Sequence, residues 1–318
     1  MKILYVTNMY PNANDPTYGI FVKEQIEAVS NCESIKYEIY TIDGKRGFVE
    51  YVKSVGKIRA LIKKERFDLV HIHYGLSGLF LLLGKVKVPT IMTLHGGDIQ
   101  AEQGKIIQVA LTKLILKKCD FAITLNERMN DIVRKYIKCT EIIPCSVNTK
   151  LFIPRERVKA ASQIVKVLFP SSRTRYVKDF PLFQRTCNLL REKYGLMVKE
   201  FYMENLSRQE VADLFCQMDL LLMTSISEGS PQVVKEAMAC NLPIVTTKVG
   251  DVSIILEGAA NCYVASRRDE KELADLAVKS LSKSQNSGTC PREKIFELGL
   301  DDDSIAKRII GVYHDIVR

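Results

Sequence analysis

The sequence predicts an α/β protein built from two doubly wound parallel sheets. Short apolar runs alternate with segments of helical periodicity along its 318 residues, which is the pattern of strands joined by covering helices. The length fits about two domains of ordinary size. Residues 144–154, PCSVNTKLFIP, have a proline near each end and no period, so we expect the boundary between the domains there.

The first half contains six apolar runs that we expect to form strands: KILYVTN, YEIYTI, LVHIHYG, TIMTLHGG, FAITLN and TEIIPC. Helix-like segments lie between them. One of these is an amphipathic helix from Phe48 to Phe67, because its apolar residues recur at helical spacing. This alternation predicts a parallel sheet that is covered on both faces.

The second half repeats the pattern. IVKVLF, DLLLMTS and LPIVTTKVG are expected strands, while SRQEVADLFCQ and VVKEAMA are expected helices. The final run, DSIAKRIIGVYHDIVR, is amphipathic and has no strand after it. We therefore expect domains at residues 1–150 and 155–302, with helix 303–318 packing back on the first. The acids at positions 301 to 303 are expected to favour the dipole at the start of this helix.

Composition excludes several classes of function. Hydrophobic residues make up 47% of the chain and charged residues 26%, as in soluble globular proteins. Nine cysteines show no CxxC pair, which indicates reduced thiols in a cytosol. The apolar run at the start of the chain is too short for a secretory signal, and the longest apolar stretch is too short for a membrane span. No dinucleotide-binding glycine motif follows the first strand and no P-loop sequence occurs.

The net charge of +9 is unevenly placed. Residues 1–150 hold 22 Lys and Arg against 15 Asp and Glu, whereas the remainder holds 24 against 22. A basic first half suits an anionic partner, although it also fits a merely soluble surface. The helix expected from Phe48 to Phe67 carries six Lys and Arg and can lie on an anionic bilayer, or it can be an ordinary surface helix. Nucleic-acid binding has no motif behind the charge, so we expect none.

The segment ISEGSPQVVKEAMACNLPIV predicts a strand, a tight turn and a helix that together bind an anion. Ser230 and Pro231 favour a helix start, with Ser230 as its cap, and Asn241 and Pro243 favour an end after Cys240. The free N–H groups and the positive dipole end at such a start would accept a diphosphate.

Two carboxylates flank this helix start. Glu228 precedes it in the turn, and Glu236 reaches back toward the turn because helical side chains lean toward the N-terminus. Glu236 lies at the edge of the apolar arc and needs a partner, since an unpaired buried charge is costly. Hydroxyls of a sugar or ribose are natural donors to it. Lys235 is expected to point away from the arc.

The stretch EGSPQVVKE, followed by AMACNLPIVTT, resembles the donor signature of retaining GT-B glycosyltransferases, especially glycosyltransferase family 4. Four further segments resemble this family in the same order: FDLVHIHYG, TIMTLHGGDI, IIPCSVNTKLFIP and NLSRQEVADLFCQMDLLLMTS. The resemblance implies two Rossmann-like domains that face each other across a cleft. It also implies a nucleotide-sugar donor such as a UDP- or GDP-hexose, with no cofactor.

The same resemblance assigns roles at the donor signature. Glu228 would contact sugar hydroxyls, and Glu236 the ribose. Sugar and phosphate would be held by the backbone amides of Gly229, Ser230, Gln232 and Val233. The family's usual aromatic-Gly-Leu stretch is SPQ here, which leaves the identity of the sugar open.

A basic segment, PSSRTRYVKDF, follows the strand IVKVLF. Arg173 and Lys178 fit the family's spacing of an Arg and a Lys that neutralise the leaving diphosphate, and Arg175 is a rival for the Arg role. No Asp-x-Asp pair lies at a plausible strand end. We therefore predict that positive side chains replace a catalytic metal.

The strand ends of the first domain hold further candidates, because ligands of open parallel sheets bind beyond the carboxyl ends of strands. By resemblance, Gly19 permits close approach of the backbone to the donor phosphate, and His95 lies near the reacting carbon of the sugar. Asp98 either binds the acceptor or caps a helix. His73 either borders the acceptor or packs inside the domain.

These observations together predict a metal-independent, retaining hexosyltransferase of the cytoplasm or the inner membrane face. It would move a hexose to a glycan or lipid-linked acceptor in polysaccharide or cell-surface glycan synthesis. The resemblance implies no side-chain nucleophile, and the leaving phosphate helps to deprotonate the acceptor. Two alternatives remain: a GT-B sugar-nucleotide epimerase, and a degenerate transferase that serves as a non-catalytic partner subunit.

Overall fold

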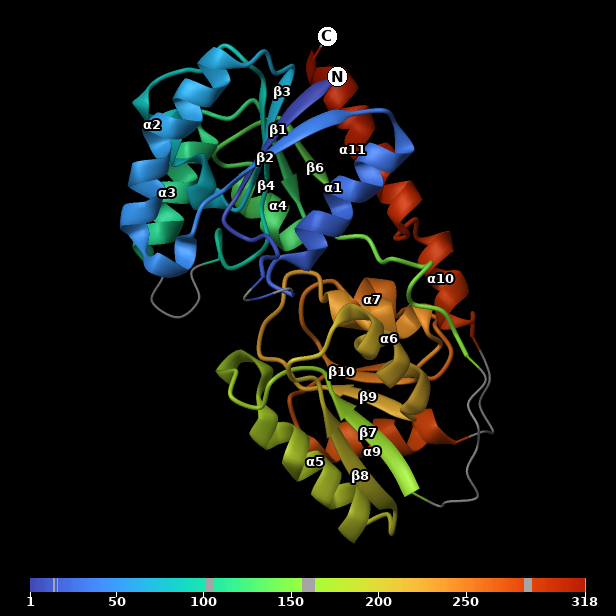
Figure 1. Cartoon of the computed structure of the whole chain (residues 1–318). Helices are drawn as coiled ribbons and strands as arrows, with labels where there is room; N and C mark the ends of the chain where they lie inside the picture. Colours follow the sequence, from blue (N-terminus) through green and yellow to red (C-terminus); the bar gives the residue numbers. More distant parts are fainter. Residues whose placement is uncertain (14, 16, 101–105, 156–163, 283–287, 318) are drawn as a thin grey trace. The chain divides into compact units, whose positions relative to one another are not determined.

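The computed structural model describes residues 1–13, 15, 17–100, 106–155, 164–282 and 288–317. The chain forms two compact units (Figure 1). Unit 1 comprises Met1–Ser146 with Asp302–Arg318, and unit 2 comprises Val147–Asp301. Each unit is a parallel sheet covered by helices on both faces, as the alternating pattern of the sequence predicts. None of the described helices is both long and apolar enough to cross a bilayer.

The sheet of unit 1 has the order β2-β1-β3-β4-β5-β6, and all its neighbouring strands are parallel. The order of the chain reverses at β1, which lies between β2 and β3. The strands are β1 (Lys2–Thr7), β2 (Lys36–Thr41), β3 (Leu69–His73), β4 (Thr90–Thr93), β5 (Phe121–Thr124) and β6 (Thr140–Ile142).

Helices cover both faces of this sheet. On one face α1 (Ile20–Cys32) lies beside α11 (Asp302–Val317), as Figure 1 shows, and both helices share a core with β1. The other face carries the remaining helical elements, apart from the short turn η1 (Gly44–Arg46): α2 (Phe48–Lys64), η2 (Gly75–Leu83), α3 (Ile106–Leu116) and α4 (Glu127–Val133). Ligands of open parallel sheets bind beyond the carboxyl ends of such strands.

The sheet of unit 2 has the order β11-β10-β9-β7-β8 and is also parallel. Its strands are β7 (Ile164–Phe169), β8 (Met197–Tyr202), β9 (Leu220–Met223), β10 (Ile244–Thr247) and β11 (Cys262–Ala265). The helical elements are η3 (Tyr176–Lys178), α5 (Phe180–Glu192), α6 (Arg208–Gln217), α7 (Gln232–Ala239), α8 (Val252–Ile255), α9 (Glu270–Leu281) and α10 (Pro291–Glu297). One core packs α5 and α9 on the sheet, and the other packs α6, α7, α8 and α10.

The boundary between the units, after Ser146, lies within the expected segment 144–154, although the first unit ends before the expected domain end at residue 150. Residues 144–154 contain no regular element, yet Val147 and Phe152 are fully buried in the core of unit 2. The chain therefore joins unit 2 directly after Ser146. The return of α11 to unit 1 is secured by contacts such as Arg308 Nη2 to Glu141 Oε1, at 2.9 Å.

Some local features differ from the expected ones. Strands β8 and β11 were not identified from the sequence, and α2 ends at Lys64, three residues before the expected end. The end of α7 agrees with expectation, because Asn241 adopts a left-handed φ of 54°. Asp302 and Asp303 lie in the first turn of α11, where negative charge stabilises the helix dipole.

Candidate functional site

The turn after β9 brings Glu228 against Lys178 inside unit 2. Lys178 Nζ lies 2.5 Å from Glu228 Oε1, and Ser225 Oγ donates to the same oxygen at 2.8 Å. The side chains of Lys178 and Glu228 are only 10% and 17% exposed. Each charge is largely desolvated and needs the other. The cation predicted to neutralise a diphosphate is therefore adjacent to the carboxylate predicted to bind a sugar.

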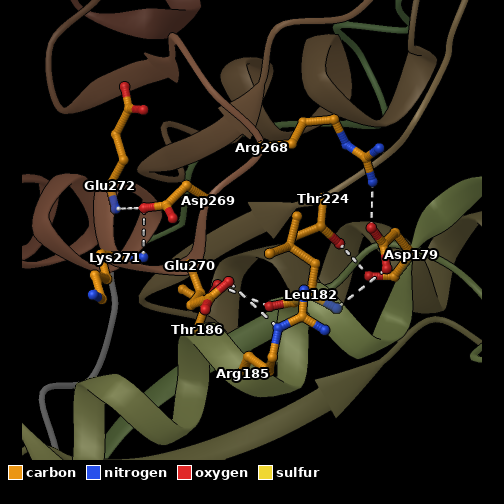
Figure 2. Close-up of polar contacts among 10 residues, drawn as sticks. All are labelled: Asp179, Leu182, Arg185, Thr186, Thr224, Arg268, Asp269, Glu270, Lys271 and Glu272. Atoms are coloured by element: carbon orange, nitrogen blue, oxygen red, sulfur yellow. Dashed lines mark hydrogen bonds and ion pairs between the residues drawn. The ribbon is translucent and has the colours of Figure 1, made fainter.

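A polar network surrounds Asp179, the residue after Lys178 (Figure 2). Asp179 has a left-handed φ of 50° and caps α5 by accepting from Leu182 N at 3.2 Å. Arg268 Nη2 contacts the second oxygen of Asp179. The hydroxyl of Thr224, at the end of β9, lies 2.9 Å from the carbonyl oxygens of both Lys178 and Asp179. These contacts tie the end of η3 to the residue that follows β9, and they hold the backbone from which the Lys178 side chain extends.

Glu236 has a charged partner within unit 2. Arg208 Nη1, at the start of α6, lies 2.7 Å from Glu236 Oε1, and the side chains are 19% and 3% exposed. The guanidinium also lies 4.7 Å from the ring centroid of Phe152, a cation–π distance. Glu236 therefore meets its need for a partner through Arg208. Arg208 was not among the residues predicted for the site, although it lies in the segment NLSRQEVADLF, which resembles the family.

The turn before α7 is built differently from the expected cap. The helix begins at Gln232 with Pro231 in the cap position, and no side chain caps it. The prediction that Ser230 caps this helix is wrong, because Ser230 Oγ lies 2.5 Å from Asp251 Oδ2 instead. Asp251 is 6% exposed, and its Oδ1 is buried without a partner among the described residues. Burial raises the pKa of Asp251, while the charge of Lys235 acts to lower it.

Lys235 itself is 0% exposed, so the expectation that it points away from the apolar arc is also wrong. The reason is the packing of α7, which is buried around most of its circumference from Val234 to Ala239. A helical wheel that assumes one exposed face does not apply to such a helix. The charge of Lys235 acts on the buried Asp251.

Two glycines bring the loops after β9 and β10 into backbone contact. Gly250 has a φ of 55°, and a Cβ at this position would lie 2.5 Å from the carbonyl oxygen of Gly229. Any other residue would therefore both strain its own backbone and push the turn that carries Glu228. The predicted binding groups at the start of α7, the amides of Gln232 and Val233, belong to the first turn of this helix.

The two candidate arginines lie at the surface of unit 2. Arg173 Nε lies 3.1 Å from Glu204 Oε1, and its guanidinium lies 4.8 Å from the ring centroid of Tyr202. Arg175 lines a cavity of about 360 Å³ together with Glu204. The Arg173 guanidinium pairs with Glu204, and Arg175 meets Lys178 through its backbone, since Arg175 O accepts from Lys178 N at 2.9 Å.

In unit 1, Gly19 precedes α1 with a φ of 69°, and a Cβ there would lie 2.3 Å from the backbone of Met9. The chain itself thus requires glycine at this position. Asp98 is fully buried and accepts from the amides of Gly75 and His95 at 3.1 and 3.0 Å. Burial raises the pKa of Asp98 to about 6, against the effect of these amides. The expected roles of Asp98 were acceptor binding and helix capping. Its contact with the amide of Gly75, the first residue of η2, fits the second role.

The candidate histidines stack in the interior of unit 1. His73 is fully buried between the rings of His71 and His95, at centroid distances of 4.3 and 5.4 Å. His73 Nδ1 lies 3.2 Å from His95 Nε2, so one ring donates and the other accepts. Burial lowers the pKa of His95 to about 3 and lowers that of His73 well below its usual range. His73 therefore has the packed role rather than a place at the border of the acceptor.

Comparison with known proteins identifies the family. Residues 25–151 match the family model described as Glycosyltransferase Family 4, and residues 185–283 match the one described as Glycosyl transferases group 1. The chain belongs to the family 4 glycosyltransferases. A curated relative, N-acetyl-alpha-D-glucosaminyl L-malate synthase of Bacillus anthracis, is 22% identical over 303 residues, which is 82% of this chain and 78% of that protein.

Solved glycosyltransferases share the fold of this chain. Sucrose-phosphate synthase from Thermosynechococcus elongatus has a TM-score of 0.77 at 18% identity, over 99% of this chain and 98% of that one. HepE of Anabaena, solved in complex with UDP-glucose, has a TM-score of 0.66 at 15% identity, over 99% and 100%. The two α/β units are thus those of the GT-B fold. Among the described residues, no group of three or more His, Cys, Asp or Glu could hold a metal ion.

Proposed function

We propose that this glycosyltransferase moves a hexose from a nucleotide sugar, with retention of configuration, to a glycan or lipid-linked acceptor. The contact that carries this proposal is the pair of Lys178 and Glu228, with 2.5 Å between Nζ and Oε1. An ammonium has three N–H donors, and the contact with Glu228 uses one of them. The others can bind a diphosphate, while Glu228 Oε2 can accept from a sugar hydroxyl. Polysaccharide or cell-surface glycan synthesis, in the cytoplasm or on the inner membrane face, is the setting that we propose.

In this proposal, Glu236 binds the ribose, and Arg208 holds the Glu236 carboxylate in place. The amides of Gly229, Ser230, Gln232 and Val233 hold the sugar and the phosphates. UDP-glucose is the donor to test first, because the similar HepE binds it. The bond from the anomeric carbon to the phosphate oxygen breaks, and the acceptor oxygen bonds to that carbon on the same face. The acceptor proton passes to the departing phosphate.

Lys178 and the helix start of α7 would stabilise the charge that develops on this phosphate, which is the work that a metal does in other transferases. The proposal therefore includes activity without a metal. Arg173 is the weakest of the proposed groups, because it lies at the surface and pairs with Glu204.

Calorimetric titration with UDP, GDP and UDP-glucose, each with and without EDTA, tests the proposal. We expect one nucleotide to bind with an affinity that EDTA leaves unchanged. Glu236→Ala should abolish binding, whereas Glu257→Ala, at an exposed position of the same unit, should leave it intact. A strict requirement for Mg²⁺ or Mn²⁺ would contradict the role of Lys178, and equal binding by the two variants would contradict that of Glu236.

A further inference from the structure

Unit 2 contains two buried charges of opposite sign that the proposed chemistry does not use. Lys235 of α7 is 0% exposed, and Asp251, the residue before α8, is 6% exposed. Charges inside a domain are costly to desolvate, and apolar side chains in their place are often no less stable. The presence of both charges therefore points to a role beyond packing.

Asp251 binds the hydroxyl of Ser230 in the turn before α7. Ser230 Oγ lies 2.5 Å from Asp251 Oδ2, which is the length of a hydrogen bond between a hydroxyl and a charged carboxylate. Asp251 Oδ1 is buried and has no partner among the described residues. Because one oxygen of this buried carboxylate is unfilled, losing the donor at the other would be costly. The contact therefore holds Ser230 firmly.

The hydroxyl of Ser230 is thus committed to the interior of unit 2. Ser230 is the first residue of the SPQ stretch, which stands where the family usually has an aromatic residue. Since its hydroxyl donates to Asp251, the group that Ser230 offers to a ligand is its backbone amide. The position of that amide depends on where the turn is held.

The loop after β10 holds this turn at both ends. Thr247 Oγ1, at the end of β10, donates to Ser225 O at 2.7 Å, and Ser225 Oγ donates to Glu228 Oε1 at 2.8 Å. Five residues after Ser225, the hydroxyl of Ser230 is bound by Asp251. Glu228 lies between these two points, so the loop after β10 determines the course of the chain on either side of it.

Lys235 supports Asp251 through its charge. Burial raises the pKa of Asp251, and the charge of Lys235 opposes this effect by favouring the ionised form. An ionised carboxylate accepts a hydrogen bond from a hydroxyl more strongly than a neutral carboxyl group does. The two buried charges therefore act together on Ser230.

We infer that Asp251 is a positioning residue for the donor sugar, because it holds the turn from Glu228 to Ser230 through the Ser230 hydroxyl. This inference rests on the proposed function, in which the same turn binds the sugar. Asp251 itself touches no substrate in this account. Its effect falls on the hexosyl group of the nucleotide sugar more than on the nucleotide, which Glu236 holds through the ribose.

Two double variants separate the hydrogen bond from the charge. Asp251→Asn with Lys235→Met keeps an oxygen that can accept from Ser230, whereas Asp251→Ala with Lys235→Met does not. Both remove the same two charges, so they are matched in charge. In calorimetry with UDP-glucose, we expect an affinity at most threefold weaker than wild type for the first and at least tenfold weaker for the second. Equal affinities in the two double variants would overturn the inference.

The affinity for UDP distinguishes positioning of the sugar from a general loss of structure. UDP lacks the sugar, so the double variant with Asp251→Ala should bind it at most threefold more weakly than the wild type does. Equal losses for UDP and UDP-glucose would assign Asp251 a purely structural role and overturn the inference. GDP-glucose and GDP replace these ligands if the wild-type protein prefers guanosine.

A second variant covers the case in which Asp251→Ala impairs folding, as seen by circular dichroism. Ser230→Ala removes only the hydroxyl and should weaken UDP-glucose at least fivefold, with a smaller effect on UDP. Ser253→Ala, at an exposed position of α8, is the matched control and should change neither affinity. Unchanged UDP-glucose affinity in Ser230→Ala would overturn the inference.

Hydrogen exchange tests the hold on the turn without any ligand. Peptides that cover residues 225–234 should exchange at least fivefold faster in the Ala double variant than in the Asn double variant, while peptides of α9 exchange alike. Equal exchange of the turn would overturn the inference. If the wild-type protein binds neither UDP-glucose nor GDP-glucose, the proposed function fails, whereas the exchange rates still decide whether Asp251 holds the turn.

Discussion

Arg208 of α6 and Glu236 of α7 form an ion pair in unit 2, with 2.7 Å between Nη1 and Oε1. The Glu236 side chain is 3% exposed, so almost all of its hydration is lost in the folded chain. Arg208 keeps 19% of its surface in contact with solvent. The pair therefore joins a desolvated carboxylate to a cation that is partly exposed and can still contact a ligand.

Arg208→Met should destabilise unit 2 by about 3 kcal/mol, because it leaves a buried carboxylate without its cation. Hydrogen exchange of α7 peptides in urea reports the unfolding of this unit. Arg155→Met is the matched control: Arg155 pairs with Asp213 at the surface, at 2.6 Å, with side chains 47% and 38% exposed. We expect a loss of about 1 kcal/mol or less for it. Adding Glu236→Gln to Arg208→Met should recover part of the stability. Equal losses in the two single variants would show that the pair is not effectively buried.

Gly250→Ala should weaken nucleotide binding through the backbone. Both Gly250 and Gly258 have positive φ values, 55° and 70°, so alanine at either position costs about 1 kcal/mol of backbone strain. Only at Gly250 does the added Cβ meet another loop, 2.5 Å from Gly229 O, whereas nothing lies within 4 Å at Gly258. We expect a tenfold or larger loss of UDP-glucose affinity for Gly250→Ala and less than a twofold change for Gly258→Ala. If calorimetry gives similar UDP-glucose affinities for the two variants, the contact between Gly250 and Gly229 does not contribute to donor binding.

The sequence predicted the layers of the fold because parallel strands buried on both faces leave long apolar runs. It did not identify β8, whose positions are exposed or only partly buried, and it gave no sign of β11. At the candidate donor site the motif located Glu228, Glu236 and Lys178. The pairing of Glu236 with Arg208 was not predictable, because Arg208 lies 28 residues away in the chain.

Local rules failed where tertiary contacts competed with them. Ser230 is a residue type that favours helix caps, yet its hydroxyl donates a hydrogen bond to the buried carboxylate of Asp251, twenty-one residues later. In unit 1, His71 and His73 lie on one face of β3, but only the fold shows that Tyr313 of α11 forms a hydrogen bond with His71. A pocket in unit 1, lined in part by residues that follow β1, β2 and β3, has no motif at all. Its wall includes four aromatic side chains from three segments of the chain: the loop before α1, the start of α2 and the residue after β3.

Lys178→Met should reduce the hydrolysis of UDP-glucose by about a hundredfold, the usual effect of removing one group that stabilises developing charge. It also leaves Glu228 unpaired, so unit 2 loses stability. The double variant with Glu228→Gln separates these effects, because it removes the unpaired charge and should restore stability while the rate stays low. Lys199→Met, at an exposed position of β8, controls for the loss of a lysine. Recovery of the rate together with stability in the double variant would assign Lys178 a purely structural role.

His71 should make the stability of unit 1 depend on pH. Its Nδ1 lies 2.6 Å from Tyr313 Oη and its Nε2 lies 2.7 Å from Thr93 Oγ1, so the neutral ring satisfies both hydroxyl groups. Burial lowers the pKa of His71 to about 3, whereas an unfolded histidine titrates near 6.5. Between these two pKa values, the unfolded chain binds a proton at His71 that the folded chain does not bind. The contribution of His71 is complete above pH 6.5, and it falls by about 1.4 kcal/mol per unit as the pH drops toward 3.

The neighbours of His71 act in opposite directions in the same range. His73 and His95 add to the acid loss, because burial also lowers their pKa values. Asp98, whose pKa is raised to about 6, opposes this loss, since the folded chain binds the Asp98 proton more readily between pH 6 and pH 4.

The measured quantity is therefore the slope of the unfolding free energy against pH. His71→Gln should reduce the slope of unfolding free energy between pH 6 and pH 4 by about 1.4 kcal/mol per unit. Hydrogen exchange of β3 peptides in urea measures it for unit 1 alone, and His314→Gln controls for the loss of a surface histidine. Equal changes of slope in the two variants would rule out burial as the cause.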